Sequence, residues 1–265
     1  MSNTPTQSAW LKLFLPFAAG YFLSYLFRTV NAVIGPVLAR ELDLADNALG
    51  LLTSTYFLAF GAAQLPLGML LDRYGPRRVE SGLLLLAGAG VAIFAMSDTL
   101  GGLAIGRALI GLGVSACLMA SFKAFALWFP PERQASLTGW VMASGGLGAL
   151  AASKPLEIAI GFTSWRVIAL GLAVATVLVA AIIWFRVPDA HSDGKSAGFK
   201  EQLAGVRQVF SSRHFWIEAA FADENSRYWL CILKKKGDYF ETNYKNALPH
   251  DDCSFYWRLL YEEGV

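Results

Sequence analysis

Six long apolar segments, separated by short polar turns, most constrain how this chain can fold. They lie at residues 11–38, 49–71, 79–96, 100–129, 137–158 and 167–185. A helix of about 20 apolar residues spans the hydrocarbon core of a bilayer. The sequence is 55% hydrophobic and 16% charged, whereas soluble domains carry about 25% charged residues. The sequence therefore predicts an all-α polytopic membrane protein in which residues 1–190 form a domain of six transmembrane helices.

The cations between these segments predict the orientation of the helices, because cytoplasmic loops of membrane proteins carry an excess of Lys and Arg. If the N-terminus lies in the cytoplasm, the cytoplasmic segments hold Lys12, Arg73, Arg77, Arg78, Arg133, Arg186, Lys195, Lys200, Arg207 and Arg213. The loops on the other side hold Arg40 and Arg166. We therefore expect an integral membrane protein with its N-terminus and its C-terminal tail in the cytoplasm.

Several classes of function find no support in the sequence. The net charge of +2 is too small to indicate a nucleic-acid partner. His191, His214 and His250 all lie outside the six segments, so an intramembrane serine protease, which needs a histidine beside its serine, is not supported. The three cysteines have no metal-like spacing. We expect no enzyme activity, no catalytic or metal-binding residue and no cofactor.

The turn between the second and third segments carries a dense pattern of glycines and charges. Its residues are Gly68, Asp72, Arg73, Gly75, Arg77 and Arg78. Gly68 offers a small residue for close helix packing, and Gly75 offers a position where the chain can reverse. We expect Asp72 to meet the positive end of the next helix or a neighbouring arginine, which would make the turn a conformational latch. The alternative is a short cytoplasmic loop that merely follows the charge rule.

This string resembles the loop between helices 2 and 3 of the major facilitator superfamily, whose signature runs Gly-x-x-x-Asp-Arg-x-Gly-x-Arg-Arg. The resemblance implies an alternating-access transporter in which the loop helps to hold one conformational state. Residues 103–113 are similar to the fourth-helix signature of that family, with Arg107, Gly111 and Gly113 on its fixed positions. This implies a coupling or structural role for Arg107. Lys123 falls on a different helical face from Arg107, so we expect it to face an inner vestibule or to reach toward the cytoplasm.

Arg28 places a cation midway through the first apolar segment. A charge inside a spanning helix is costly and usually faces an aqueous cavity. By their spacing, one helical face carries Tyr21, Tyr25, Arg28 and Asn31. This face suits a carboxylate, because Arg offers paired donors and Tyr and Asn add neutral ones. The alternative is an arginine paired with a helix-end carbonyl or with an acid on another helix.

Two residues of the second segment extend this candidate binding site. We expect Tyr56 and Gln64 to line the same cavity, although a hydrogen bond between helices explains Gln64 nearly as well. Residues 25–31 are also similar to the first helix of organic-anion symporters of the superfamily, in which Tyr-x-Asp-Arg and a nearby Asn are common. Phe27 stands here in place of the acid of those symporters.

The distribution of charge also predicts which helices lie at the periphery. Helices that face lipid cannot easily hold a charge. The apolar stretches of the third and sixth segments hold no ionisable residue, whereas those of the first, fourth and fifth do. We therefore expect the third and sixth helices to be peripheral.

The composition changes after the sixth segment. Residues 191–216 are predicted to form a cytoplasmic linker with an amphipathic helix, because Phe199, Leu203, Val206 and Phe210 recur at helical spacing. Residues 217–265 never give an apolar run long enough to span a bilayer. We interpret them as an atypical polar tail, disordered or cytoplasmic, that is unrelated to the family and results from a frameshift, insertion or truncation. A small native cytoplasmic tail is the alternative.

The resemblance covers residues 11–216 and implies the N-terminal six-helix half of a transporter. The implied activity is secondary-active transport of a small organic anion, a carboxylate, across a bacterial inner (plasma) membrane, with a proton or a sodium ion as coupling ion. A single half leaves the Arg28 face unpartnered, so we expect a second six-helix half or a homodimer in the lipid bilayer, or an incomplete transporter. The alternative is an inactive or regulatory membrane fragment that associates with full-length transporters.

Overall fold

The computed structural model describes residues 7–44, 46–189 and 211. The described residues form seven α-helices: α1 (Gln7–Glu41), α2 (Asp46–Met96), α3 (Leu100–Val114), α4 (Cys117–Trp128), α5 (Pro131–Ala151), α6 (Lys154–Phe162) and α7 (Trp165–Arg186). The predicted amphipathic helix and the predicted polar tail lie outside the described residues.

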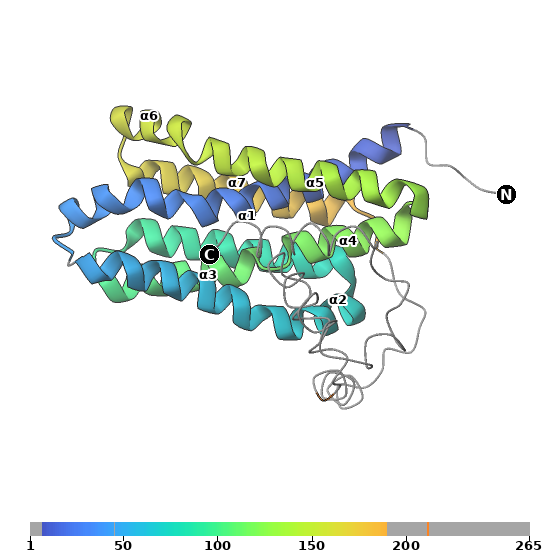
Figure 1. Ribbon diagram of the computed structural model, residues 1–265, viewed down its shortest axis with the longest axis horizontal. Helices are drawn as coiled ribbons and strands as arrows, with labels where there is room; N and C mark the ends of the chain where they lie inside the picture. Colours follow the sequence, from blue (N-terminus) through green and yellow to red (C-terminus); the bar gives the residue numbers. More distant parts are fainter. Residues whose placement is uncertain (1–6, 45, 190–210, 212–265) are drawn as a thin grey trace, which may run out of the picture. The chain divides into compact units, whose positions relative to one another are not determined.

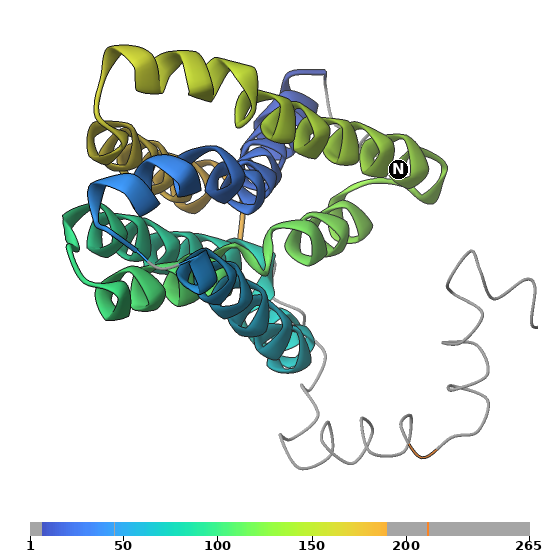
Figure 2. The same cartoon turned by 60° about the vertical axis from the view of Figure 1, so that its left-hand side comes forward.

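The chain runs back and forth between two ends of a helical bundle (Figure 1). The loops at 42–44, 97–99 and 163–164 lie together on the left of Figure 1, and we call this the Arg166 end. The turn at Gly75, the loop at 129–130 and the end of α7 lie on the right, and we call this the Gly75 end. Figure 2 shows the same helices with the Arg166 end turned toward the viewer.

Interruptions of the helices explain how seven elements make six passages along the bundle. Gly75 divides α2 into two passages, because its φ of 77° and ψ of 164° are not helical. This left-handed φ favours glycine, and Pro76 follows as a residue suited to the first turn of a helix. The predicted reversal at Gly75 is confirmed. The pairs α3–α4 and α5–α6 each continue in one direction across a short break, so each pair makes one passage (Figure 1).

The fold class predicted from the sequence is confirmed: the described part of the chain is all-helical, and its six passages correspond to the six predicted segments. Five stretches are long and apolar enough to span a membrane, namely Leu13–Glu41, Pro66–Met96, Leu100–Trp128, Pro131–Phe162 and Trp165–Arg186. The predicted segment at 49–71 does not qualify by itself. Thr53, Tyr56 and Gln64 lower its apolarity, and these side chains face other helices rather than lipid.

Small residues let the helices approach closely, as expected for membrane helices. A methyl group on Gly113 of α3 would lie 2.5 Å from both the Leu83 carbonyl oxygen and the Ala87 backbone nitrogen of α2. On the other side of the bundle, Gly148 of α5 packs directly on the backbone of Phe22 in α1. These contacts join α2 to α3 and α1 to α5, and they leave no room for a side chain at either glycine.

The prediction that two helices are peripheral holds for α7 and not for the third passage. Val174 and Phe185 of α7 are 61% and 81% exposed, so α7 turns a broad apolar face outward. The third passage, after Gly75, buries Leu84 and Val91 and also holds a fully buried acid, Glu80. The expectation that this segment carries no ionisable group was wrong, because it considered only the apolar stretch that follows Glu80.

Candidate functional site

Arg28 of α1 lies among aromatic rings. Its guanidinium carbon is 4.8 Å from the centre of the Tyr25 ring, 5.1 Å from Phe60 and 5.9 Å from Phe57. Cations are attracted to the faces of such rings. Its Nε is buried without a hydrogen-bond acceptor, and no ion pair of Arg28 occurs in the described part of the chain. The Nε–H group of Arg28 therefore remains a donor that no described acceptor uses.

The two phenols on the same face of α1 are held in place by α5. The rings of Tyr21 and Tyr25 meet edge to face, with centroids 5.1 Å apart. A methyl group on Gly145 of α5 would lie 2.6 Å from Cε1 of Tyr21 and 3.0 Å from Cδ2 of Tyr25. The absence of a side chain at Gly145 thus lets the two phenols fill this space between α1 and α5.

Tyr56 of α2 lies between the two membrane arginines. It is fully buried, and its hydroxyl interacts electrostatically with both Arg28 and Arg107. Its ring also faces the Arg107 guanidinium carbon at 5.2 Å. The structure therefore brings together four of the predicted site residues, Tyr21, Tyr25, Arg28 and Tyr56.

The remaining two predicted binding residues make contacts between helices. The Asn31 side chain donates a hydrogen bond to Oγ1 of Thr53, at 2.7 Å, and so joins α1 to α2. The Gln64 side chain donates to the Ser115 carbonyl, at 3.3 Å, at the break between α3 and α4. For Gln64 this is the interhelical hydrogen bond that the sequence analysis kept as an alternative.

Arg107 is more deeply buried than Arg28, with 2% of its surface exposed. Its Nη1 donates to the Phe27 carbonyl at 3.3 Å, and its guanidinium carbon lies 5.9 Å from the Phe94 ring. It borders a small cavity together with Asn31 of α1 and Ala169 of α7, among other residues. The guanidinium thus links α3 to α1 next to the Arg28 face. Gly111 of the same signature packs against the backbone of Tyr56.

The charged turn at the Gly75 end is joined to two other helices. Asp72 forms an ion pair with Lys123 of α4, a partner on another passage that the sequence did not predict. Arg78 pairs with Asp189, which follows α7, at 2.5 Å. These two ion pairs fasten the turn to α4 and to the end of α7, and they account for the position of Lys123.

The other residues of the turn have separate environments. The guanidinium carbon of Arg77 lies 5.1 Å from the Trp184 ring of α7, and that of Arg73 lies 5.3 Å from Tyr74. The expectation of close packing at Gly68 was wrong for the described chain. A methyl group on Gly68 would meet no described atom within 4 Å, because this residue lies on an outward face of α2.

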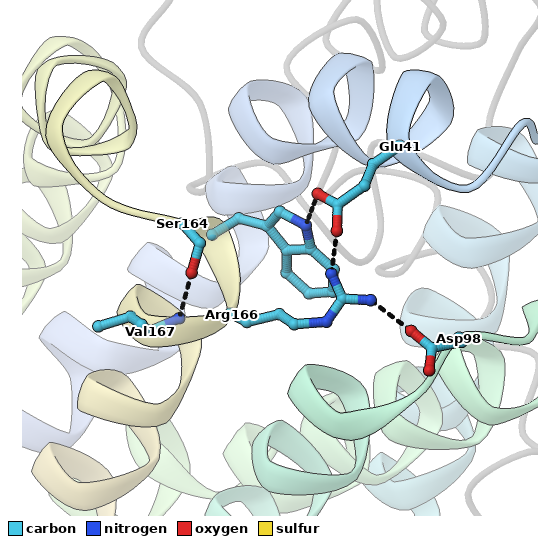
Figure 3. Close-up of polar contacts among 6 residues, drawn as sticks. Glu41, Asp98, Ser164, Arg166 and Val167 are labelled. Atoms are coloured by element: carbon cyan, nitrogen blue, oxygen red, sulfur yellow. Dashed lines mark hydrogen bonds and ion pairs between the residues drawn. The ribbon is translucent and has the colours of Figure 1, made fainter.

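A second ionic cluster closes the Arg166 end and was not predicted. Arg166 of α7 donates to Glu41 at the end of α1 and to Asp98 before α3, as Figure 3 shows. The Trp165 indole also donates to Glu41, at 2.7 Å. The signal in the sequence was present, since Arg166 is one of two cations in the loops at this end, and acids lie in the neighbouring loops, Glu41, Asp43 and Asp46 around one and Asp98 in the other.

Sequence reasoning also missed Glu80 as a functional candidate. Its side chain is fully buried, and neither carboxylate oxygen has a hydrogen-bond partner in the described structure. The sequence feature that could have indicated it is the position of this acid, which is the second residue of the third apolar segment.

The described helices are apolar and antiparallel, and the bundle holds an arginine without an ion pair and several phenols. These features define a polytopic integral membrane protein with a polar interior. Residues 17–233 match the model of the Major Facilitator Superfamily. The chain belongs to this family, whose members are transporters and not enzymes. The match passes residue 217, where the polar tail is predicted to begin.

Curated relatives are identical to this chain at about a quarter of the aligned positions. A hexuronate transporter of Escherichia coli strain K12 is 25% identical over 214 residues, which cover 74% of this chain and 49% of the relative. A probable L-galactonate transporter of the same strain is 27% identical over 256 residues, covering 88% and 54%. A probable sulfoacetate transporter of Cupriavidus necator is 25% identical over 175 residues, covering 65% and 41%. The chain thus spans about half the length of these relatives.

A solved structure shows the same fold. The crystal structure of a bacterial homologue of the human lysosomal transporter Spinster, in an inward-facing and unoccupied conformation, matches with a TM-score of 0.63 at 19% identity. The match covers 80% of this chain and 51% of that one. The described helices therefore have the fold of about half of a facilitator-type transporter.

Proposed function

We propose that this chain supplies the N-terminal half of a pathway for secondary-active transport of a small organic anion that carries a carboxylate. The observation that supports it is Arg28, whose guanidinium lies against three aromatic rings and whose buried Nε has no acceptor among the described residues. A carboxylate can accept two parallel hydrogen bonds from such a group. The names of the hexuronate, L-galactonate and sulfoacetate transporters all designate anions, which favours the same substrate class.

The neighbouring phenols would complete the recognition of the anion. Tyr21, Tyr25 and Tyr56 bring three hydroxyl groups to the region of Arg28, and hydroxyl donors can hold the oxygens of a hydroxylated acid. In this proposal Asn31 and Gln64 hold neighbouring helices together rather than bind the anion, since both side chains already donate hydrogen bonds to other helices. Arg107 helps to hold α1 in position beside Arg28 through its hydrogen bond to the Phe27 carbonyl.

The proposal includes a second set of helices. Transporters of this kind bind substrate near the middle of the membrane between two related halves. A second six-helix half, or a second copy of this chain, would cover the Arg28 face. With the Gly75 end in the cytoplasm of a bacterial inner membrane, the two ion pairs of the charged turn would hold one state of the alternating-access cycle.

The test is uptake of radiolabelled galacturonate into liposomes that contain the purified chain. We expect accumulation, and a loss of about tenfold or more in Arg28→Ala, because a hydrogen bond to a charged group contributes about 1.5–3 kcal/mol. Arg28→Lys should keep part of the activity. Arg40→Ala is the matched control, since Arg40 is an exposed arginine on the same helix.

Two outcomes would contradict the proposal. Uptake that is unchanged in Arg28→Ala would remove Arg28 from the site. Absence of uptake for every tested anion would favour the alternative, an inactive or regulatory fragment. Co-purification of the chain with a full-length relative would test that alternative.

A further inference from the structure

Glu80 is a buried acid that the proposed anion site does not use. It lies in the third passage, five residues after the Gly75 turn, which places it about 7.5 Å along the helix from the turn. Its side chain is fully buried. Both of its oxygens lack a hydrogen-bond partner, and none of the ion pairs in the described chain includes it.

Among the described residues, none forms an ion pair with Glu80. From α1, Gly20 packs directly against Oε1 of Glu80, and a methyl group on this glycine would collide with that oxygen. From α4, the buried thiol of Cys117 interacts with it electrostatically. On its own helix, Arg77 lies three residues earlier, but its guanidinium is stacked on Trp184 of α7.

An ionised carboxylate in such a place would be strongly destabilising. Removing a charged carboxylate from water without a partner costs several kcal/mol in real proteins, and the group takes up a proton instead. A neutral carboxylic acid also fits better against the glycine backbone and the apolar side chains of α1 and α2. The arrangement around Glu80 therefore suits the protonated form.

We propose that Glu80 is a proton-binding site of this transporter, protonated while α1 and α2 are packed together and ionised when they separate. On release, the O–H bond of the carboxylic acid breaks, the electron pair stays on the carboxylate, and the proton passes to water. Arg77, one turn away and without an ion pair in the described chain, is then the cation that can stabilise the carboxylate.

The contact with Gly20 is what links the proton to the conformation. Because α1 has no side chain at this position, the two helices close directly over the Glu80 carboxyl. Water can reach it only when α1 moves away from α2. Since the protonated form favours the packed state and the ionised form the separated state, proton binding shifts the balance between the two. The coupling of proton binding to transport rests on the proposed transport function. The protonation of Glu80 is independent of that function.

The test is infrared spectroscopy of the purified chain in liposomes at neutral pH. We expect the spectrum of the wild type minus that of Glu80→Gln to contain the carbonyl band of a protonated carboxylic acid. Glu132→Gln is the control, because Glu132 is an exposed acid in the first turn of α5 at the same end of the bundle. Its difference spectrum should contain only carboxylate bands. Glutamine keeps the shape of a neutral glutamic acid, so the Glu80→Gln chain should fold.

A carboxylate band in the Glu80→Gln difference at neutral pH would overturn the inference. A protonated band that disappears as the pH is raised would support it, and so would loss of proton-driven galacturonate uptake in Glu80→Gln. If no uptake is found but the protonated band is present, the proton site stands and the proposed transport function fails.

Discussion

At the scale of single residues, two ionisable side chains inside the bundle have different surroundings. Arg28 lies against aromatic rings that attract a cation, and its Nε has no described acceptor. Glu80 lies against a glycine backbone and apolar groups that favour a neutral acid. Both are costly to keep in a membrane helix, and ionisable residues in such places usually mark functional sites, so we place the anion at Arg28 and the proton at Glu80.

A second prediction at this scale concerns the glycines. We expect Gly113→Val to destabilise the chain by about 1–3 kcal/mol or more, because its side chain would collide with the backbone of the third passage. Gly146→Val is the control, since Gly146 has no atom within 4 Å on its open side in the described structure. Thermal unfolding in detergent measures both. Equal melting temperatures would show that α2 and α3 are less closely packed than the structure indicates.

At the scale of helices, each end of the bundle is closed by charges that come from different elements. Arg166 joins the ends of α1, α2 and α7, as Figure 3 shows for Glu41 and Asp98. At the Gly75 end, Asp72 and Arg78 join the turn of α2 to α4 and to the end of α7. The helices are thus held in register by contacts that lie outside their apolar faces.

We expect Arg166→Glu to lower stability more than Arg40→Glu does. The change replaces two attractive contacts by repulsion with Glu41 and Asp98, whereas no described acid pairs with Arg40. Exposed ion pairs contribute about 0–1 kcal/mol each and are screened by salt. The difference in melting temperature between the two variants should therefore shrink in high salt. A difference that is independent of salt would contradict an ionic origin.

At the scale of the whole molecule, the ion pairs of the Gly75 end should hold one conformation of the bundle. Asp72 belongs to the family signature, but its partner in this structure is Lys123 on the fourth passage. A latch between α2 and α4 can open only if the two passages move relative to each other. This makes the pair a candidate switch between states, as the sequence analysis expected for the turn.

We expect Lys123→Glu to make Cys117 more reactive toward a maleimide. Cys117 is fully buried in α4 between the helices that the latch holds together. Loss of about 1 kcal/mol would raise the population of opened molecules about fivefold, and the alkylation rate with it. Cys231 and Cys253 are replaced by serine so that Cys117 alone reports. Combining Lys123→Glu with Asp72→Lys should restore slow alkylation, and a failure to restore it would argue against the pair.

The local pattern was enough to predict several features of the fold. The reversal at Gly75 follows from a glycine before a proline between two apolar segments, and Tyr21, Tyr25 and Arg28 share a face because a helix repeats every 3.6 residues. The contacts of Asn31 with Thr53 and of Gln64 with Ser115 join residues far apart in the sequence. No local pattern specifies such pairs, so Gln64 could be placed on a helix but not assigned a partner.

Hydrophobic length and helical spacing are local properties, so the six apolar segments, the charged turn and the two family signatures can be recognised in the amino-acid sequence. Which polar groups find partners depends on how the helices pack. Asp72 meets Lys123, Arg166 meets Glu41 and Asp98, and Glu80 meets the bare backbone of Gly20. The reason is physical: whether a charge in a membrane helix is paired, free for a ligand or held neutral depends on the neighbouring helix that packs against it.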